Sequence, residues 1–409
     1  MSVFSSAELL IPPERLLPDW AVIACDQFTS QPDYWRAVRE QAGDRPSACH
    51  IIFPEAELGS DEKKRIASIN AAMRRYLDEK LFRRFPDAMI YVERTLLDGS
   101  IRRGVVGVVD LEAYDYRPNA VSPIRATEQT VVERIPPRVQ IRRDACLELS
   151  HVMLLMDDSA NAVLDSLTAR KDALPLVYDF ELMRGGGRIR GWLVSGTEKA
   201  RFAAAIDDYE RQTAERFAAL GRAPLLYAVG DGNHSLAAAK SCWEARKAAG
   251  ACADHPARFA MVELQNIHDS AQRFEPIHRI LTGVSPRELL EACKAISAPG
   301  GRPVAWYAGD VHGVLELDPS LGELPVAVLQ PFLDRYLAEH CGSIDYIHGE
   351  DVAIRLAQAP DALAFLLPNI SKDDFFRGLV MDGVLPRKTF SMGHAQEKRY
   401  YLECRRIDG

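Results

Sequence analysis

The stretch that decides the fold runs from Leu225 to Trp243 and reads LLYAVGDGNHSLAAAKSCW. Its opening, 225–229, is a short apolar run with the length and composition of a β-strand. The run ends at GDGN (230–233), a combination typical of a tight loop, and an alanine-rich segment with high helix propensity begins at Ser235. The sequence therefore predicts a strand, a glycine loop and the first turn of a helix in direct succession.

This predicted loop has the chemistry of an anion site. Gly230 and Gly232 permit positive φ angles and a close approach of a ligand to the backbone. The first turn of a helix presents N–H groups that the helix itself does not use, and its dipole favours negative charge, so phosphate is the expected ligand. His234 is placed where its ring can reach that anion. The alternative is that the glycines form an ordinary turn and that a polar side chain caps the helix; the candidates for that cap are Asp231, Asn233 and Ser235.

Length and composition exclude several classes of protein. The 409 residues are enough for two or three domains, and 47% hydrophobic with 26% charged residues is ordinary for a globular protein. A net charge of −8 argues against nucleic-acid binding, which needs a basic surface. No apolar run approaches the roughly 20 residues of a membrane span, and the N-terminus does not resemble a signal peptide. The eight cysteines include no Cys-x-x-Cys pair, so we expect a reducing, cytoplasmic location.

Hydrophobic periodicity predicts helices and strands in mixed order, and hence the α+β (mixed α/β) class, with mixed sheets and flanking helices. An amphipathic helix is expected over 60–85 and a long one over 197–220. Asp98-Gly99 between two apolar runs predicts a hairpin over 88–111, and the three glycines at 185–187 predict a second one. Motif clusters suggest three regions, 1–125, 126–284 and 285–409.

Two further stretches carry residues with catalytic potential. Asp26 ends a buried-strand pattern, and Glu128 lies between Thr127 and Thr130, upstream of Arg134 and further arginines. Carboxylates beside cations and hydroxyls suit acid–base chemistry on an anionic substrate. The alternatives are a turn for Asp26 and a solvated charged segment for the Glu128 stretch.

A metal site has weaker support. The paired carboxylates Asp157 and Asp158 at a predicted strand end suit Mg²⁺, although such a pair is more often a turn with a helix cap. His268 and Asp269 supply two metal ligands without a third. We therefore assign no metal-ligating residue.

The motifs together resemble the domain-of-unknown-function 1015 family. GDGNHS is similar to its Asp-Gly-His-His-Arg signature: Asp231, Gly232 and His234 match, whereas Asn233 and Ser235 replace the first His and the Arg. The segment 127–134 resembles its His-Glu-x-x-Thr motif followed by Arg, with Thr127 in place of His. His278-Arg279 matches its Pro-x-x-His-Arg segment, and Arg387-Lys388-Thr389 stands where it has Lys-Ser-Thr.

The resemblance implies a nucleotide-binding core like that of the ParB/sulfiredoxin-like proteins and the archaeal free-serine kinases. It implies a kinase that uses ATP or ADP with Mg²⁺ and phosphorylates a small hydroxyl compound such as an amino acid. Glu128, Asp26 and His234 would be catalytic. The nucleotide would be bound by Gly230, Asp231, Gly232, Asn233 and Ser235 of the loop, by Thr127, Thr130 and Arg134, and by His278-Arg279 and Arg387-Lys388. The alternative is a non-catalytic, nucleotide-binding regulatory protein.

Overall fold

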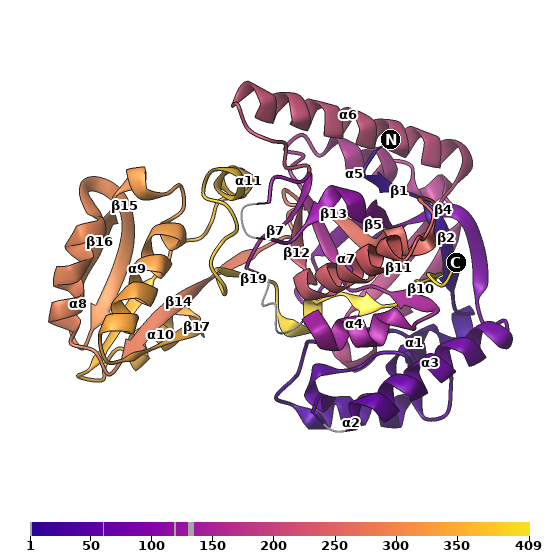
Figure 1. Ribbon diagram of the computed structural model, residues 1–409, viewed down its shortest axis with the longest axis horizontal. Helices are drawn as coiled ribbons and strands as arrows, with labels where there is room; N and C mark the ends of the chain where they lie inside the picture. The colour runs from indigo at the N-terminus through magenta and orange to yellow at the C-terminus, as the bar shows by residue number, and fades with distance from the viewer. Residues whose placement is uncertain (1, 60, 118–119, 130–134) are drawn as a thin grey trace. The chain divides into compact units, whose positions relative to one another are not determined.

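The computed structural model describes residues 2–59, 61–117, 120–129 and 135–409, and the chain divides into two compact units (Figure 1). The first unit combines Met1–Ala126, Thr130–Gln272 and His394–Gly409, and the second combines Thr127–Gln129 with Arg273–Gly393. Both units contain helices and strands, which confirms the mixed α/β class. Each unit joins stretches that are distant in sequence. The three predicted regions are consecutive stretches, and this division into three stays a prediction.

A large mixed sheet forms the centre of the first unit. Its strands follow in the order β6 (Tyr114–Asp115), β7 (Ile124–Ala126), β12 (Tyr227–Asp231), β9 (Met153–Met156), β13 (Phe259–Asn266), β5 (Ile101–Asp110), β4 (Arg83–Thr95), β2 (Ala7–Ile11), β21 (Cys404–Arg406) and β8 (Leu147–Leu149). β1 (Phe4–Ser5) pairs with β5, and the hairpin of β10 (Leu176–Glu181) and β11 (Arg188–Val194) joins β4. Both predicted hairpins, β4–β5 and β10–β11, are confirmed as antiparallel pairs.

The sheet is buried on both faces because its central strands are apolar at successive positions. Along β4, Ile90 and Val92 belong to one hydrophobic core, whereas Met89 and Tyr91 belong to another. This is the two-residue alternation of a strand between two packed layers. α1 (Leu17–Trp20), α2 (Pro32–Ala42) and α3 (Glu62–Asp78) contribute to the first core. α5 (Ala162–Thr168), α6 (Gly196–Ala219) and α7 (Asn233–Ala248) contribute to the second.

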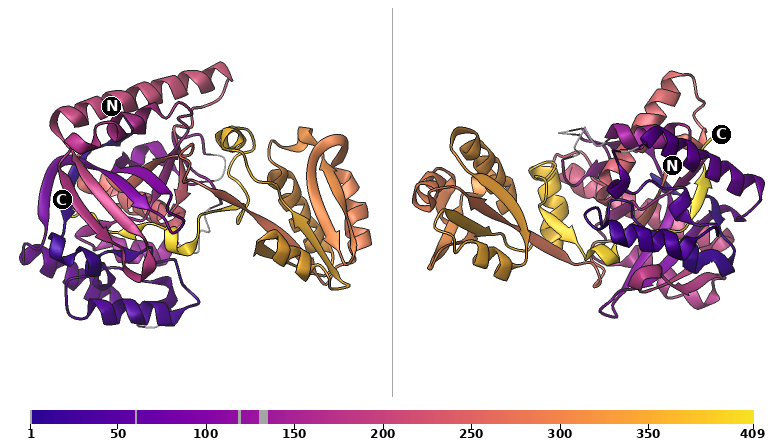
Figure 2. Two further views of the ribbon diagram at one scale, coloured as in Figure 1. Left: turned by 180° about the vertical axis from the view of Figure 1, so that it is seen from behind. Right: turned by 90° about the horizontal axis from the view of Figure 1, so that it is seen from below.

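The helices of the first unit follow their apolar stripes. α6 was predicted over 197–220, and it runs along one side of the unit in Figure 1 and in the view from behind (Figure 2). α4 (Ile135–Arg143) lies against α7. None of the helices in the described part of the chain has both the length and the apolar composition needed to cross a membrane.

A two-stranded sheet brings the C-terminal segment to the N-terminal one. β20 (Tyr400–Tyr401) pairs antiparallel with β3 (Val22–Ile23), with Tyr401 opposite Val22. The backbone continues this contact, because the N–H of Ala24 donates to the carbonyl oxygen of Arg399 at 2.9 Å. The pairing therefore holds the segment that follows β3 beside the segment 398–401.

The second unit has its own sheet, ordered β16 (Val311–Leu317), β15 (Ser297–Ala308), β18 (Ala362–Leu366), β14 (Phe274–Thr282) and β17 (Ser343–His348), with β19 (Phe390–Met392) on β14. Its helices are α8 (Pro286–Ala292), α9 (Pro325–Glu339), α10 (Glu350–Leu356) and α11 (Lys372–Met381). Ile280 of β14 packs against α10, whereas the next residue toward the N-terminus, Arg279, bonds Gln330 of α9. The two helices therefore cover opposite faces of this sheet.

Candidate functional site

The predicted strand, glycine loop and helix are confirmed as β12, Gly232 and α7. Gly232 has a φ of 80° and forms the N-cap of α7. A Cβ atom here would lie 2.9 Å from Val152 Cγ2 and 3.0 Å from Val152 Cα, so both the backbone angle and the space require glycine. The first intrahelical bond runs from the Leu236 N–H to the Gly232 carbonyl oxygen at 3.0 Å. The amides of residues 233–235 therefore precede the helical hydrogen-bond ladder.

Polar atoms of the loop remain available to a ligand. Asp231 Oδ1 accepts a hydrogen bond from the Gly232 N–H at 2.9 Å, while Asp231 Oδ2 lies 3.4 Å from Lys398 Nζ. Within the described residues, Asp231 Oδ2 and Asn233 Oδ1 are buried atoms that accept no hydrogen bond. Because the N-cap is a glycine, no side chain caps α7 through a hydrogen bond. The helix-cap alternative for Asn233 and Ser235 is thus wrong.

A chain of short contacts begins beside this loop at His151. His151 Nε2 lies 3.5 Å from Ser235 Oγ, and His151 Nδ1 lies 2.6 Å from the hydroxyl oxygen of Tyr401. The Tyr401 hydroxyl in turn donates to Cys25 Sγ at 3.0 Å. Burial, followed by the negative charge of Asp26, raises the pKa of the Cys25 thiol to about 12, so this cysteine is a thiol and not a thiolate near neutral pH.

Asp26 is the charged member of the same cluster. Burial raises its pKa, but electrostatic interaction with His151, a hydrogen bond from Gln27 and the positive charges of Lys398 and Arg138 outweigh burial and hold the pKa below its ordinary value. The Gln27 amide donates to Asp26 Oδ1 at 3.1 Å. Asp26 is therefore an ionised carboxylate in the first unit, and the β3–β20 pairing places it in the same cluster as Lys398.

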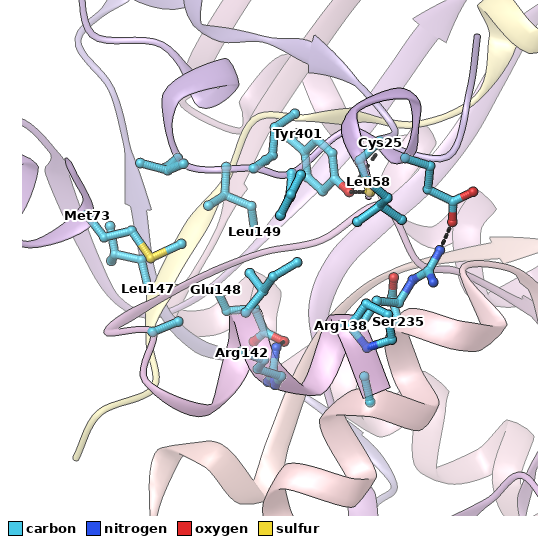
Figure 3. A pocket seen from close by; sticks show the side chains of 18 residues that line it. Cys25, Leu58, Met73, Arg138, Arg142, Leu147, Glu148, Leu149, Ser235 and Tyr401 are labelled. Atoms are coloured by element: carbon cyan, nitrogen blue, oxygen red, sulfur yellow. Dashed lines mark hydrogen bonds and ion pairs between the residues drawn. The ribbon is translucent and has the colours of Figure 1, made fainter. Parts of the chain in front are cut away.

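A pocket of about 130 Å³ opens next to this cluster (Figure 3). Cys25, Tyr401 and Ser235 lie on its wall, together with two partly buried ion pairs, Arg138–Glu55 and Arg142–Glu148. The rest of the wall is largely apolar and comes from the segment 51–58 and from α3, α4, β8 and α7, with Leu58, Met73, Ile141, Leu147, Leu149 and Ala238 among its residues.

The second unit gathers a separate group of predicted residues around Glu128. Glu128 Oε1 accepts a hydrogen bond from the Thr389 N–H at 3.1 Å, and the Leu385 N–H donates to the Thr127 carbonyl oxygen at 2.9 Å. Burial raises the pKa of Glu128, and it outweighs the backbone hydrogen bonds and the charges of Lys388 and Arg279, which act to lower it. Glu128 is therefore a buried carboxyl group whose pKa lies above its ordinary value.

Arg279 is fully buried beside this carboxylate. Its Nε donates to Gln330 Oε1 at 2.9 Å, and its guanidinium lies over the ring of Tyr346 at 5.2 Å. Arg387 lies over the same ring at 5.7 Å and donates from Nε to the Tyr346 hydroxyl at 3.3 Å. Burial lowers the pKa of Arg279 to about 10, which leaves it a cation at neutral pH. Two of the predicted basic residues, Arg279 and Arg387, thus contact Tyr346.

The predicted site residues therefore fall into two groups. Asp26 and the loop 230–235 belong to the first unit, with His234 in the first turn of α7. The second unit holds Thr127 and Glu128 with His278-Arg279 and Arg387-Lys388. Thr130 and Arg134 lie outside the described residues. Their assignment as nucleotide-binding residues stays a prediction.

His278 has the environment of a buried histidine. Burial lowers its pKa, and its Nδ1 atom makes no hydrogen bond with the described residues. Its assignment as a nucleotide-binding residue also stays a prediction.

The two stretches considered as metal sites, Asp157-Asp158 and His268-Asp269, are held by contacts within the protein. His268 Nε2 lies 2.8 Å from Asp157 Oδ1, and Asp157 Oδ2 pairs with Arg216 at 2.8 Å. Asp158 Oδ2 accepts from the Val163 N–H in the first turn of α5 at 2.8 Å. The described residues contain no group of three or more His, Cys, Asp or Glu side chains arranged to hold a metal ion.

Comparison with known proteins assigns the family. The family described as a protein of unknown function (DUF1015) matches residues 6–406. The chain belongs to the DUF1015 family. No curated protein matches it.

Three solved structures are similar to this DUF1015 chain at low identity. A conserved hypothetical protein from Pyrococcus furiosus is 11% identical, with a TM-score of 0.35, over 73% of this chain and 94% of the other. A free serine kinase in complex with AMP is 12% identical, with a TM-score of 0.38, over 73% and 90%. SbnI with a C-terminal truncation, from Staphylococcus aureus, is 12% identical, with a TM-score of 0.36, over 70% and 82%. At such TM-scores the function of this DUF1015 protein has to be argued from its own residues.

Several residues of the cluster were missed by the sequence analysis. Among them are His151, Lys398 and Tyr401, none of which lies in a motif that the sequence analysis singled out. Cys25 and Tyr401 are 376 residues apart in the sequence, so no local pattern joins them. One signal was available: a His directly before a buried apolar strand lies at a sheet end, where polar side chains gather.

Proposed function

We propose that this protein binds a purine nucleotide with Mg²⁺ and transfers a phosphoryl group to a small hydroxyl-bearing metabolite. One observation carries the proposal: the β12–α7 loop presents the unused amides of residues 233–235 at the positive end of a helix, beside Lys398. Backbone amides at a helix N-terminus bind phosphate oxygens, and a nearby ammonium adds charge stabilisation. His234, in the same first turn, is the side chain that we assign to the transferred phosphoryl group.

Mg²⁺ fits the donors present in this unit. Asp231 Oδ2 is a buried carboxylate oxygen that accepts no hydrogen bond within the described residues, and Asp26 is ionised and lies near the same lysine. Protein-bound Mg²⁺ typically takes one or two carboxylates and completes its shell with phosphate oxygens and water. Asp231, helped by Asp26, would hold the ion, which would supply charge neutralisation on the phosphates.

The acceptor hydroxyl needs a carboxylate that positions or deprotonates it. Asp26 and Glu128 are the two candidates, one in each unit. Asp26 is held ionised by its neighbours, whereas burial raises the pKa of Glu128 toward the range of a general base. Comparing Asp26→Asn with Glu128→Gln in the same transfer assay decides between them.

The test of nucleotide binding is a thermal-shift titration with ATP and ADP, with and without Mg²⁺. A ligand at 100 times its Kd stabilises the folded protein by about 2.7 kcal/mol. His234→Ala should lose most of that shift and fold normally. His312→Ala, an exposed histidine on β16, is the matched control and should keep the shift. No shift of the wild type with any nucleotide would refute the proposal.

A second assay separates an enzyme from a switch. ATP is crossed with a panel of small hydroxy compounds and amino acids, and phosphorylated product is detected by mass spectrometry. Formation of one phosphorylated compound supports the phosphotransferase. Nucleotide binding without consumption of any hydroxyl compound would support the non-catalytic regulatory protein instead.

A further inference from the structure

The contacts around His151 suit an imidazole that carries its proton on Nδ1. The Tyr401 hydroxyl donates its hydrogen to Cys25 Sγ at 3.0 Å, so its oxygen is the acceptor in the 2.6 Å contact with His151 Nδ1. A neutral imidazole has one N–H and one lone pair. With the proton on Nδ1, the lone pair of Nε2 faces Ser235 Oγ at 3.5 Å. This assignment follows from the hydrogen-bond network.

A carboxylate acts electrostatically on the His151 ring. Asp26 acts on His151 through its negative charge, and the Tyr401 oxygen receives the Nδ1–H. A histidine that takes a proton from a hydroxyl group becomes an imidazolium, which a nearby carboxylate stabilises. Ser235, His151 and Asp26 therefore have the roles of a nucleophile, its base and a charge that supports the base, with Tyr401 orienting the ring. A separation of 3.5 Å between nucleophile and base is within what unliganded sites show.

The pocket determines what reaches the Ser235 hydroxyl. Ser235 and Leu149 line it (Figure 3), and Ile141 and Ala238 belong to the same wall. The charged side chains on the wall are already paired with each other, as in the 2.8 Å contact between Arg142 and Glu148. The volume of about 130 Å³ is close to that of an engineered apolar cavity of about 150 Å³ that binds benzene. A hydrocarbon group of about four to six carbons fits such a space.

We propose that Ser235 is a nucleophile with His151 as its general base, and that the protein hydrolyses esters of short apolar carboxylic acids. The acyl chain would occupy the pocket of Figure 3, with the ester carbonyl at Ser235. This activity is separate from the proposed phosphoryl transfer and needs neither nucleotide nor Mg²⁺.

The reaction balances without a further reagent. Ser235 Oγ bonds to the carbonyl carbon while its proton passes to His151 Nε2, and the developing oxyanion lies near the positive end of α7. The carbon–oxygen bond to the alcohol then breaks, and the alcohol leaves with the proton from His151. Water attacks the acyl-serine and gives its proton to His151. Cleavage of the acyl–Oγ bond returns that proton to Ser235 and releases the carboxylic acid.

The experiment uses the full chain without nucleotide. A fluorophosphonate probe is added and the labelled peptide is identified by mass spectrometry, while p-nitrophenyl esters of two to ten carbons are assayed in parallel. We expect labelling at Ser235 and the highest kcat/KM at four to six carbons, which is about the chain length that the cavity accommodates. Ser235→Ala should abolish the labelling, and His151→Gln should lower kcat by about 10²–10⁴-fold.

Two variants act as controls. Ser166→Ala removes a half-buried hydroxyl that donates to the Val163 carbonyl oxygen in α5, and it should leave labelling and hydrolysis unchanged. Ala238→Leu fills the pocket and should shift the preference toward shorter acyl chains. The proposal is overturned if the folded wild type is not labelled, if the label lies on another residue, or if Ser166→Ala loses as much activity as Ser235→Ala. Because no nucleotide is present, none of these outcomes depends on the proposed phosphoryl transfer.

Discussion

Replacing Gly232 by alanine separates the two reasons for a glycine at the start of α7. Gly232 has a φ of 80°, and an added Cβ would meet Val152 Cα at 3.0 Å, which is backbone and cannot rotate away. Gly221, which follows α6, has a φ of 66° and nothing within 4 Å of such a Cβ. Gly221→Ala therefore suffers only the left-handed backbone penalty of about 1–2 kcal/mol. Gly232→Ala adds an overpacking penalty of about 1–3 kcal/mol.

The assay is urea unfolding of the wild type and both variants, followed by ADP titrations of their melting temperatures. Gly232→Ala should have a free energy of unfolding about 1–3 kcal/mol below that of Gly221→Ala. It should also lose most of the stabilisation by ADP, because the added methyl group displaces the amides of residues 233–235. Gly221→Ala should respond to ADP like the wild type. Equal stability of the two variants, with equal ADP shifts, would refute the steric argument and the position of the phosphates.

Three further predictions concern the acids and the metal. Glu128→Gln should change nucleotide affinity by less than about threefold, which is under ~1 kcal/mol. It should lower turnover at least about 100-fold. If Asp26→Asn slows transfer and Glu128→Gln does not, the catalytic role belongs to Asp26. The two acids should affect the pH dependence of stability in opposite senses. Asp26 has a lowered folded pKa, so its stabilisation is present above about pH 4 and is lost as the pH falls through that folded pKa. Glu128 has a raised folded pKa, so Glu128→Gln should gain stability relative to the wild type as the pH rises above about 4.3, measured by urea unfolding across pH. Calorimetry should show Mg²⁺ binding only in the presence of nucleotide, and tight zinc in the purified protein, measured by elemental analysis, would contradict this.

Local signals in the sequence predicted the fold well wherever a few neighbouring residues decide the structure. The alternation of apolar residues around Asp98-Gly99 fixed the β4–β5 hairpin, and the apolar stripe of 197–220 fixed α6. The same kind of reasoning found the β12–α7 loop, because glycine is required there by a backbone angle. Exact helix ends are harder to predict in this way: α2 begins at Pro32, and Asp33 pairs with Arg36 in its first turn instead of capping it.

Contacts between distant segments could not be predicted in this way. The pairing of β3 with β20 depends on short apolar strands that match many partners, so nothing in either strand names the other. Cys25, His151, Ser235 and Tyr401 become neighbours only through that pairing and through the large sheet. Burial cannot be read from local sequence either: only the structure shows that desolvation of Glu128 outweighs the charges of Lys388 and Arg279 and raises its pKa.

Arg399 explains how the C-terminal segment joins the cluster of Cys25, His151 and Ser235, although these residues are distant from it in the sequence. Its buried guanidinium donates to the Ser150 carbonyl oxygen at 3.0 Å and to Glu403 Oε2 at 2.8 Å, and it pairs with Glu263 at 2.9 Å. Such a buried cation is tolerated only with its partners in place, so the segment has essentially one position. Ser150 precedes His151, and Arg399 lies between Lys398 and Tyr400-Tyr401. A single charged anchor therefore fixes both the histidine and the tyrosine that orients it.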